Sequence, residues 1–438
     1  MRLVWLLGAW FLLSAFGPKP QLFEPPPADA SQPRTLLVFL DGTRNDSGTN
    51  TNIHKLFRAV VDDRTANARA DTIAFYIEGV GTGYRVIGVA TGWGISHRVR
   101  QAYGWLLHHR RPGDRIAIFG FSRGAYSARI LASMLQHAGL PAQPVTDRAR
   151  ALAMADALFD AVKQRQATAA TRMANARRAA ARRGDPPLIP HVPIAFLGLW
   201  DTVEALGDPT DDPALVDLPN TRYGDQLCNV EQAAHAVAAD DNRAAVYRPV
   251  LLTGPHLLAD CPQGAGQGGI DGRVQEVWFT GAHSDVGGSE AGDYRGRQLG
   301  GVTLNWMLAQ PAIGPGGMAL LPPDTRFPEN PMDASGNGFR STPIGKAQPR
   351  SLAIRQRSVD RLYNGGMIKL HPSVISNVQQ RARQPHEFDW VAAFPSCFDI
   401  ANAMAVFRQA QPGCPLQPLA QPLPAQPETV AAPGSTLP

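Results

Sequence analysis

Residues 115–124 read RIAIFGFSRG, and this stretch decides the fold. The apolar run at 115–120 predicts a buried parallel strand. The residues at 120–124, GFSRG, fit the pattern G-x-S-x-G, and YSARILASMLQHAG at 126–139 predicts a helix. A strand, a sharp turn and a helix form the context in which this pattern carries a nucleophile. We therefore predict Ser122 as a nucleophile; the alternative is a plain glycine-rich turn.

Four more apolar runs predict further strands, and helical stretches such as 95–110 alternate with them. These runs are TLLVFL (35–40), TIAFYI (72–77), VPIAFLGLW (192–200) and VQEVWFTG (274–281). The alternation predicts an α/β fold with a mostly parallel, doubly wound sheet. In such sheets the chemistry gathers at the carboxyl ends of the strands. Polar residues stand at four of these ends: Asp41, Ser122, Asp201 and His283.

A serine nucleophile needs a base, and the base needs an orienting carboxylate. Hydrolases with this elbow carry them in the order serine, acid, histidine. Among the eleven histidines, His283 follows a predicted strand and sits in a glycine-flanked loop. We predict His283 as the base and Asp201, at the end of the intervening strand, as the acid. Asp285 is the rival acid; its other role would be to brace the loop by accepting backbone N–H bonds.

Backbone amides near Ser122 are candidates for holding the oxyanion of the reaction intermediate. The N–H of Arg123 lies at a predicted helix N-terminus, where a negative charge is stabilised. Gly42 or Thr43 would supply a second N–H; the alternative is a turn in which Asp41 accepts bonds from local amides. The DGT sequence also occurs in aspartate-nucleophile phosphatases, but those need an aspartate where this chain has Phe39. The supporting residues that we predict are Asp41, Gly120, Gly124 and Asp285.

Taken together, these motifs resemble an α/β-hydrolase domain family of unknown function that includes type VI secretion phospholipase effectors. The matching stretches are LDGTRND and TNIHKLF (within 40–57), EGVGTG (78–83), GDRIAIFGFSRGAYSARILASM (113–134), LGLWDTVEALG (197–207), HAVAADDNR (235–243) and WFTGAHSDVGG (278–288). The resemblance covers about residues 34–305 and implies an α/β-hydrolase fold that hydrolyses phospholipids or other lipid esters. It places the family's serine, acid and histidine on Ser122, Asp201 and His283.

The expected function is hydrolysis of carboxylic esters, foremost lipid esters, through an acyl-enzyme and with neither metal nor cofactor. No Cys/His spacing typical of a zinc site occurs. Two alternatives stay open. One is an esterase of soluble or polymeric esters, and the other is a non-catalytic envelope binding or scaffold protein with the hydrolase fold.

The charge of the chain is concentrated in one segment. The 42 Lys and Arg and 37 Asp and Glu give a net charge of +5, and residues 162–184 hold seven cations and no acid. Removing these seven from +5 leaves −2 for the rest, which argues against a general nucleic-acid-binding surface. The segment lies in a predicted helical insertion at about 141–190. It would cap the active site, contact anionic headgroups at a membrane surface, or form a plain solvated helix.

The N-terminal residues predict export. Residues 3–16, LVWLLGAWFLLSAF, follow Arg2 and have the length of a signal-peptide core rather than a full span. We predict a signal peptide or membrane anchor at 1–17 and a Pro-rich spacer at 18–33. The expected location is the bacterial cell envelope, exported or anchored to the inner membrane with the body in the periplasm.

The remaining segments are a catalytic domain at 34–305, an extension packed on it at 306–408 and a disordered Pro-rich tail at 409–438. Four cysteines permit two disulfides in an exported chain, or four thiols: Cys228, Cys261, Cys397 and Cys414. The sequence carries no indication of the oligomeric state.

Overall fold

A computed structural model describes most of the chain between residues 20 and 408. The described residues are 20–26, 29, 32–42, 50–79, 93–165, 167–204, 222–239, 241, 249–252, 255–258, 261, 273–288, 298–314, 316–331, 367–374, 398–401 and 404–408. The predicted signal peptide or anchor and the predicted tail lie outside them. Within these ranges, no helix combines the length and the apolar character that crossing a membrane requires.

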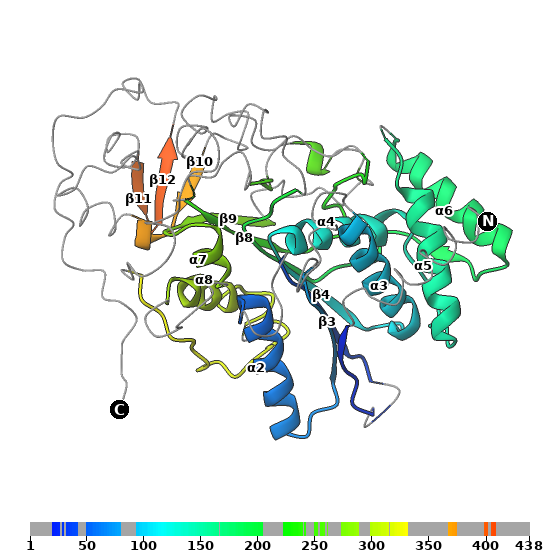
Figure 1. Cartoon of the computed structure of the whole chain (residues 1–438), viewed down its shortest axis with the longest axis horizontal. Helices are drawn as coiled ribbons and strands as arrows, with labels where there is room; N and C mark the ends of the chain where they lie inside the picture. The colour runs from blue at the N-terminus through cyan, green and yellow to red at the C-terminus, as the bar shows by residue number, and fades with distance from the viewer. Residues whose placement is uncertain are drawn as a thin grey trace, which may run out of the picture.

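One ten-stranded sheet runs through the molecule in the order β1-β3-β2-β4-β7-β8-β9-β10-β12-β11 (Figure 1). Neighbours from β3 to β10 are parallel, whereas β1, β12 and β11 pair antiparallel at the two edges. The strands are β1 (Gln21–Phe23), β2 (Thr35–Leu40), β3 (Thr72–Ile77), β4 (Arg115–Phe121), β7 (Phe196–Trp200), β8 (Ala233–Ala238), β9 (Val274–Phe279), β10 (Met367–Leu370), β11 (Phe398–Ala401) and β12 (Met404–Arg408).

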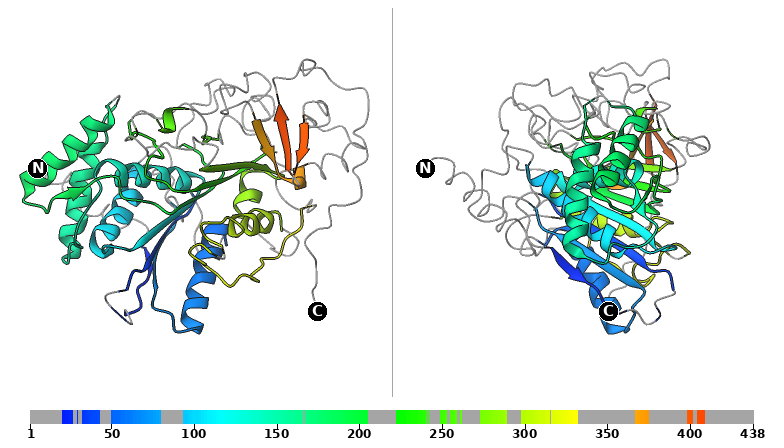
Figure 2. Two further views of the ribbon diagram at one scale, coloured as in Figure 1. Left: turned by 180° about the vertical axis from the view of Figure 1, so that it is seen from behind. Right: turned by 90° about the vertical axis from the view of Figure 1, so that its right-hand side faces the viewer.

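Helices cover both faces of the sheet, which confirms the predicted α/β class (Figure 2). They are α2 (Asn52–Ala66), α3 (Trp93–His109), α4 (Arg123–His137), α5 (Arg148–Val162), α6 (Ala169–Arg183), α7 (His283–Gly287) and α8 (Leu299–Leu308), with a 3-10 turn, η2 (Pro255–Leu258). Alternate residues of β2 show the two layers. Val38 packs in the core with α3, α4 and α5, while Phe39 packs in the core with α2 and α8.

The five predicted strands correspond to β2, β3, β4, β7 and β9. Strand β8 was not predicted. Its sequence, AAHAVA, is rich in alanine, which is depleted in strands, and carries a histidine at its third position. All six of its residues are buried between β7 and β9, so its neighbours impose the extended conformation.

Part of the predicted spacer belongs to the folded body. Gln21–Phe23 pair with β3, and Glu24 Oε1 accepts a hydrogen bond of 2.7 Å from Trp105 Nε1. The open edge of β3 offers backbone groups that this segment satisfies, despite the prolines around it. The predicted extension likewise contributes to the sheet, because β10 continues it beyond β9. The boundaries predicted at 33 and 305 therefore do not mark the limits of the sheet.

The predicted insertion contains α5 and α6, preceded and followed by the short paired strands β5 (Leu140–Pro141) and β6 (Leu188–Ile189). One of the seven cations at 162–184 is not a surface group. Arg172 is 1% exposed and donates hydrogen bonds to the carbonyl oxygens of Val162, Gln164 and Arg222. It ties the two helices to the neighbouring loop and is unavailable to a partner.

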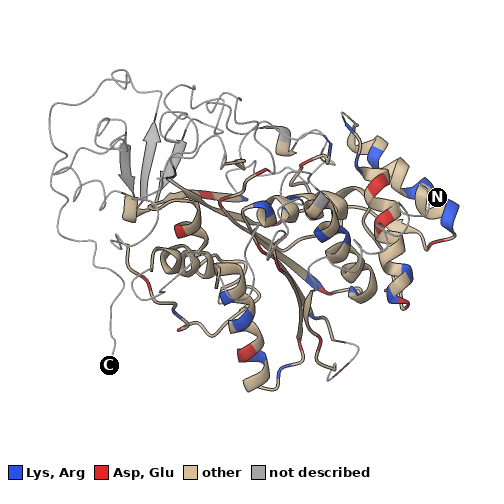
Figure 3. Ribbon diagram, viewed as in Figure 1, with Lys and Arg blue, Asp and Glu red and all other residues tan. Residues whose placement is uncertain are grey.

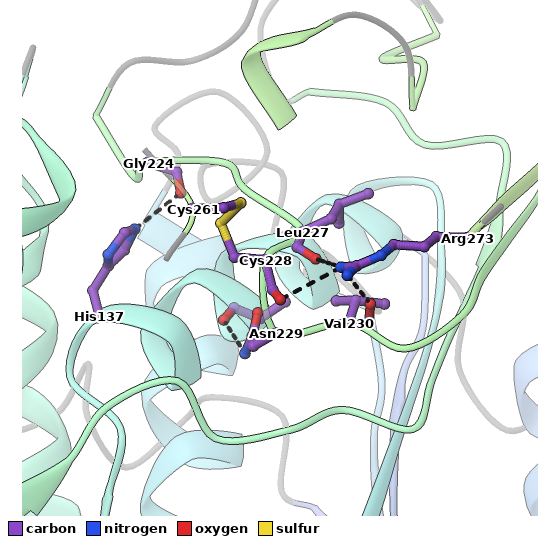
Figure 4. The surroundings of a disulfide bond; sticks show 9 residues. His137, Gly224, Leu227, Cys228, Asn229, Val230, Cys261 and Arg273 are labelled. Carbon is purple, nitrogen blue, oxygen red and sulfur yellow. Dashed lines mark hydrogen bonds between the residues drawn. A yellow bond between two sulfur atoms is a disulfide. The ribbon is translucent and has the colours of Figure 1, made fainter. Parts of the chain in front are cut away.

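A disulfide joins Cys228 to Cys261, so one of the permitted pairs is present (Figure 4). It lies where the chain enters β8, and Arg273 Nη1 donates to the carbonyl oxygens of Leu227, Cys228 and Val230 there. The neighbouring Asn229 donates through Nδ2 to the carbonyl oxygens of Ala132 and Val192. The remaining cysteines, Cys397 and Cys414, lie outside the described residues.

Removing this disulfide is expected to destabilise the fold. The bond closes a loop of 33 residues, and loss of such a constraint costs about 3–4 kcal/mol of the free energy of unfolding. Denaturant unfolding of the oxidised protein and of Cys228→Ser/Cys261→Ser measures the difference. The wild type under reducing conditions is the control and should match the double variant. Equal unfolding midpoints for all three samples would contradict the prediction.

Candidate active site

Ser122 stands at the turn between β4 and α4, as the G-x-S-x-G pattern predicts. Its φ of 57° and ψ of −126° are unusual for a residue with a side chain, and such a conformation persists only where its surroundings hold it. The flanking glycines make the turn possible. A Cβ on Gly124 would lie 2.0 Å from the Leu40 carbonyl oxygen, and one on Gly120 would lie 2.5 Å from the Cα of Ala125.

The three residues predicted from chain order meet in space. His283 Nε2 lies 2.8 Å from Ser122 Oγ, and His283 Nδ1 lies 2.6 Å from Asp201 Oδ2. The exposed fractions of Ser122, His283 and Asp201 are 5%, 4% and 0%. Each hydrogen bond is therefore shielded from water, where an electrostatic interaction is strongest.

Asp201 follows β7 in a second strained turn, with a φ of 37°. Its Oδ1 accepts a hydrogen bond of 2.9 Å from the backbone N–H of Ala238, at the end of β8, which leaves Oδ2 directed at His283. The elbow and this turn are joined directly, because the Ser122 N–H donates to the Trp200 carbonyl oxygen at 3.0 Å.

His283 is the first residue of α7. Its backbone N–H donates to Asp241 Oδ2 at 3.0 Å, and its ring packs on Phe121 with 4.7 Å between ring centroids. Asp285, the rival acid, instead accepts the backbone N–H of Ala282 at 2.8 Å through Oδ2. This is the loop-bracing role that the sequence left open.

Asp41 is buried at the end of β2 and organises the turn beside the elbow. Its Oδ2 accepts hydrogen bonds from Thr51 Oγ1 at 2.7 Å and from the Tyr76 hydroxyl at 2.8 Å. The Gly42 N–H donates to Asp41 Oδ1 at 2.6 Å, which is the turn that the sequence offered as its alternative role. Thr43 lies outside the described residues.

Burial raises the pKa of Asp41 from 3.8 to about 7, although its hydrogen-bond donors oppose this shift. Between these two values the folded protein binds a proton that the unfolded chain releases. Stability therefore falls as pH rises through this range and levels off above pH 7. Asp41→Asn removes this contribution, so its Tm should fall less than that of the wild type between about pH 5 and about pH 8. Parallel Tm changes in thermal melts would count against a titrating Asp41.

Two groups at the site were not predicted. Asp241, which holds the backbone of His283, lies just beyond the end of β8; recognition of that strand would have placed it at a strand end. Arg98 of α3 is fully buried, and its Nη1 donates to the Asp41 carbonyl oxygen. No motif signals this contact, because it depends on how α3 packs. In the described part of the chain, no group of three or more His, Cys, Asp or Glu side chains is arranged to hold a metal ion.

Several known proteins are similar to this chain. Over 134 residues it is 33% identical to the uncharacterized protein YEL023C of Saccharomyces cerevisiae (strain ATCC 204508 / S288c), covering 26% of this chain and 19% of that protein. A crystal structure of an uncharacterized protein from Pseudomonas aeruginosa shares 18% identity over 75% of this chain and 50% of that one, with a TM-score of 0.36.

A further solved structure, the Tle1 effector bound to the VgrG spike of the Type 6 secretion system, shares 19% identity, with a TM-score of 0.29. The match covers 62% of this chain and 57% of that chain. The chain thus spans about a fifth of the yeast protein and about half of the chains in these two structures.

The family model described as "T6SS, Phospholipase effector Tle1-like, catalytic domain" matches residues 34–310. This range contains both strained turns, at Ser122 and Asp201, and also His283. It extends five residues beyond the predicted end of the catalytic domain. The chain therefore belongs to the family of Tle1-like phospholipase effector catalytic domains of the type VI secretion system.

Proposed function

We propose that this protein is a serine hydrolase that cleaves carboxylic esters. The observation that carries the proposal is the continuous chain of hydrogen bonds from Ser122 through His283 to Asp201, at 2.8 and 2.6 Å. In the reaction, Ser122 Oγ attacks the ester carbonyl carbon while its proton passes to His283 Nε2. His283 then gives that proton to the leaving alcohol. Water repeats the two transfers, releasing the acid and restoring Ser122.

The electrostatics of the site suit this cycle. Asp201 lies against Nδ1, so it favours the tautomer with a lone pair on Nε2 and stabilises the imidazolium that forms. The backbone N–H of Arg123 begins α4, at the positive end of the helix dipole, and we assign it to the oxyanion. No metal or cofactor takes part in these steps.

The proposed substrate is a lipid ester, foremost a phospholipid, and family membership supports this choice. The alternatives from the sequence are a soluble or polymeric ester and binding without catalysis. The test compares initial rates on phospholipid vesicles and on short-chain soluble esters, with Ser122→Ala as the blank. Faster turnover of vesicles supports the lipid substrate. Turnover of soluble esters alone would replace it, and no turnover of either would remove the catalytic proposal.

We also propose that the insertion contacts an anionic membrane surface. Arg positions lie along α6 at the end of the molecule formed by α5 and α6 (Figure 3). A groove of about 520 Å³ between these helices is lined by Lys163, Arg178 and Arg182, with Asp160 as its acidic member. Such a concentration of cations attracts anionic lipid headgroups.

Removing two cations from this groove should weaken vesicle binding. Arg178→Ala/Arg182→Ala is expected to lower affinity for phosphatidylglycerol vesicles by about 30-fold, at about 1 kcal/mol per cation. Binding to phosphatidylcholine vesicles should change little. The control, Arg58→Ala/Arg326→Ala, removes the same charge from exposed positions outside the insertion. Vesicle co-sedimentation measures the effect; equal losses for both double variants would reject the groove as the contact.

The proposed location is the cell envelope, with the body in an oxidising compartment. Two observations support it: the apolar run at 3–16, which has the length of a signal-peptide core, and the Cys228–Cys261 disulfide. Disulfides persist mainly in such compartments. Protease protection in cells with a permeable outer membrane tests this location; a body protected together with cytoplasmic markers would contradict it.

A further inference from the structure

A second histidine–carboxylate pair lies inside the sheet, behind the turn that carries Asp201. His235 of β8 and Glu276 of β9 are register partners, and their side chains are 2.7 Å apart from Nδ1 to Oε2. They are 0% and 5% exposed. Residues on the same face include Leu199, Ala233 and Val274, which belong to the apolar core beneath α4. Polar groups here carry a desolvation cost that apolar residues would avoid.

The pair makes one contact that bears on the site. The backbone N–H of Thr202, the residue after Asp201, donates to His235 Nε2 at 3.0 Å. Because a backbone N–H is always a donor, Nε2 must present a lone pair, and the ring proton resides on Nδ1. His235 therefore donates to Glu276 Oε2. The carboxylate selects the tautomer that can hold Thr202.

Glu276 also secures the other side of Thr202. The same Oε2 accepts the backbone N–H of Leu252 at 2.6 Å, and two residues earlier the Val250 N–H donates to the Thr202 carbonyl oxygen at 2.8 Å. Both backbone groups of Thr202 are thus tied to one carboxylate, the N–H through His235 and the carbonyl through the segment at 250–252.

The hydrogen bonds to Thr202 support a strained turn at Asp201. Asp201 has a φ of 37°, a conformation that residues with side chains rarely adopt and that the surroundings must impose. The Asp201 N–H is held by the Ala236 carbonyl oxygen at 2.7 Å, so His235 and its neighbour in β8 fix consecutive amides of the turn. A change in this turn would move Oδ2 away from His283.

We propose that His235, oriented by Glu276, is a positioning residue that holds the Asp201 turn in its catalytic geometry. The proposal rests on the proposed serine-hydrolase function. His235 touches neither the substrate nor the reacting atoms. It acts through Thr202 and Asp201, so its loss should slow the chemical step without weakening substrate binding.

His235→Leu tests the proposal, because leucine fills the apolar surroundings but cannot accept the Thr202 N–H. The expected result is a fall of about 10- to 100-fold in kcat, the order that a small misplacement costs, with KM unchanged. His235→Gln should recover most of this loss, since one amide can accept from Thr202 and donate to Glu276. Glu276→Leu is the second variant and should also lower kcat at constant KM, as it removes the oxygen that accepts the Nδ1 proton and so selects the tautomer.

A double variant separates positioning from a general structural role. In an Asp201→Ala background, His235→Leu should have no further effect on kcat, because the group it positions is gone. Circular dichroism and Tm report the folded fraction of every variant. Unchanged kcat in His235→Leu, or equal losses with and without Asp201, would overturn the positioning role while leaving the hydrolase function intact. A wild type that turns over no ester would overturn both.

Discussion

Replacing Ser122 by alanine is expected to lower kcat for ester hydrolysis by about 10⁴- to 10⁶-fold, the range observed when a triad nucleophile is lost. Alanine removes the Oγ that receives the acyl group and that faces His283 Nε2. The backbone conformation with a φ of 57° remains demanding for alanine, as it is for serine. The fold should therefore persist, since the turn is held by Gly120, Gly124 and the Trp200 carbonyl oxygen.

Covalent labelling with a fluorophosphonate probe tests whether Ser122 is the nucleophile, independently of the substrate. The adduct is detected by intact-protein mass. The wild type should gain one adduct and Ser122→Ala none. Ser133→Ala is the matched control, because Ser133 lies on α4, the helix that begins after Ser122, but donates to the Tyr223 carbonyl oxygen. Equal labelling of wild type and Ser122→Ala would show that the nucleophile lies elsewhere.

The parallel centre of the sheet could be predicted from sequence because its strands are buried on both faces. TLLVFL at Thr35–Leu40 and TIAFYI at Thr72–Ile77 are continuous apolar runs, and both match the observed strands residue for residue. Strand β8 was not predicted because alanine carries little information about strand or helix, and because His235 breaks the apolar run. Its conformation is imposed by β7 and β9 on either side, which no local pattern records.

The candidate site also has features that could be predicted from sequence and features that could not. The serine, the acid and the histidine could be chosen because each ends a strand and because the order of such groups along the chain is restricted. Asp201 was preferred to Asp285 from the sequence, but the different contact of each carboxylate, His283 for Asp201 and the Ala282 N–H for Asp285, is visible only in the structure. The role of Gly42 also depended on hydrogen bonding, since its amide is engaged by the preceding side chain. These are properties of loops, whose detailed geometry is set by packing.

The two strained turns of the site, at Ser122 and Asp201, are hydrogen-bonded to each other. Ser122 and Asp201 both have positive φ, and their turns are linked by two backbone hydrogen bonds, from Ser122 to Trp200 and from Val203 to Ser122. Two strained turns that brace each other hold the hydroxyl and the carboxylate at a fixed separation, which His283 spans. Disturbing either turn should therefore affect the other.

Replacing Asp201 by asparagine is expected to lower kcat by about 10³- to 10⁴-fold at neutral pH. Oδ1 accepts the Ala238 N–H, so the amide group of asparagine must place its NH₂ at the position of Oδ2, facing His283 Nδ1. An NH₂ there requires a lone pair on Nδ1, which puts the ring proton on Nε2, where the base should receive a proton from Ser122. The positions of Ser122 and His283 are kept, but His283 in this tautomer cannot accept the Ser122 proton at Nε2.

Asp285→Asn is the matched control, because it makes the same chemical change two residues from His283. Asp285 accepts the Ala282 N–H at 2.8 Å through Oδ2, and asparagine can accept the same bond through its carbonyl oxygen. Its loss in kcat should be below about 10-fold, as expected where geometry alone is disturbed. The comparison is made on kcat with circular dichroism as the check on folding. A larger loss in Asp285→Asn than in Asp201→Asn would identify Asp285 as the orienting acid, because only removal of that acid changes the tautomer of His283.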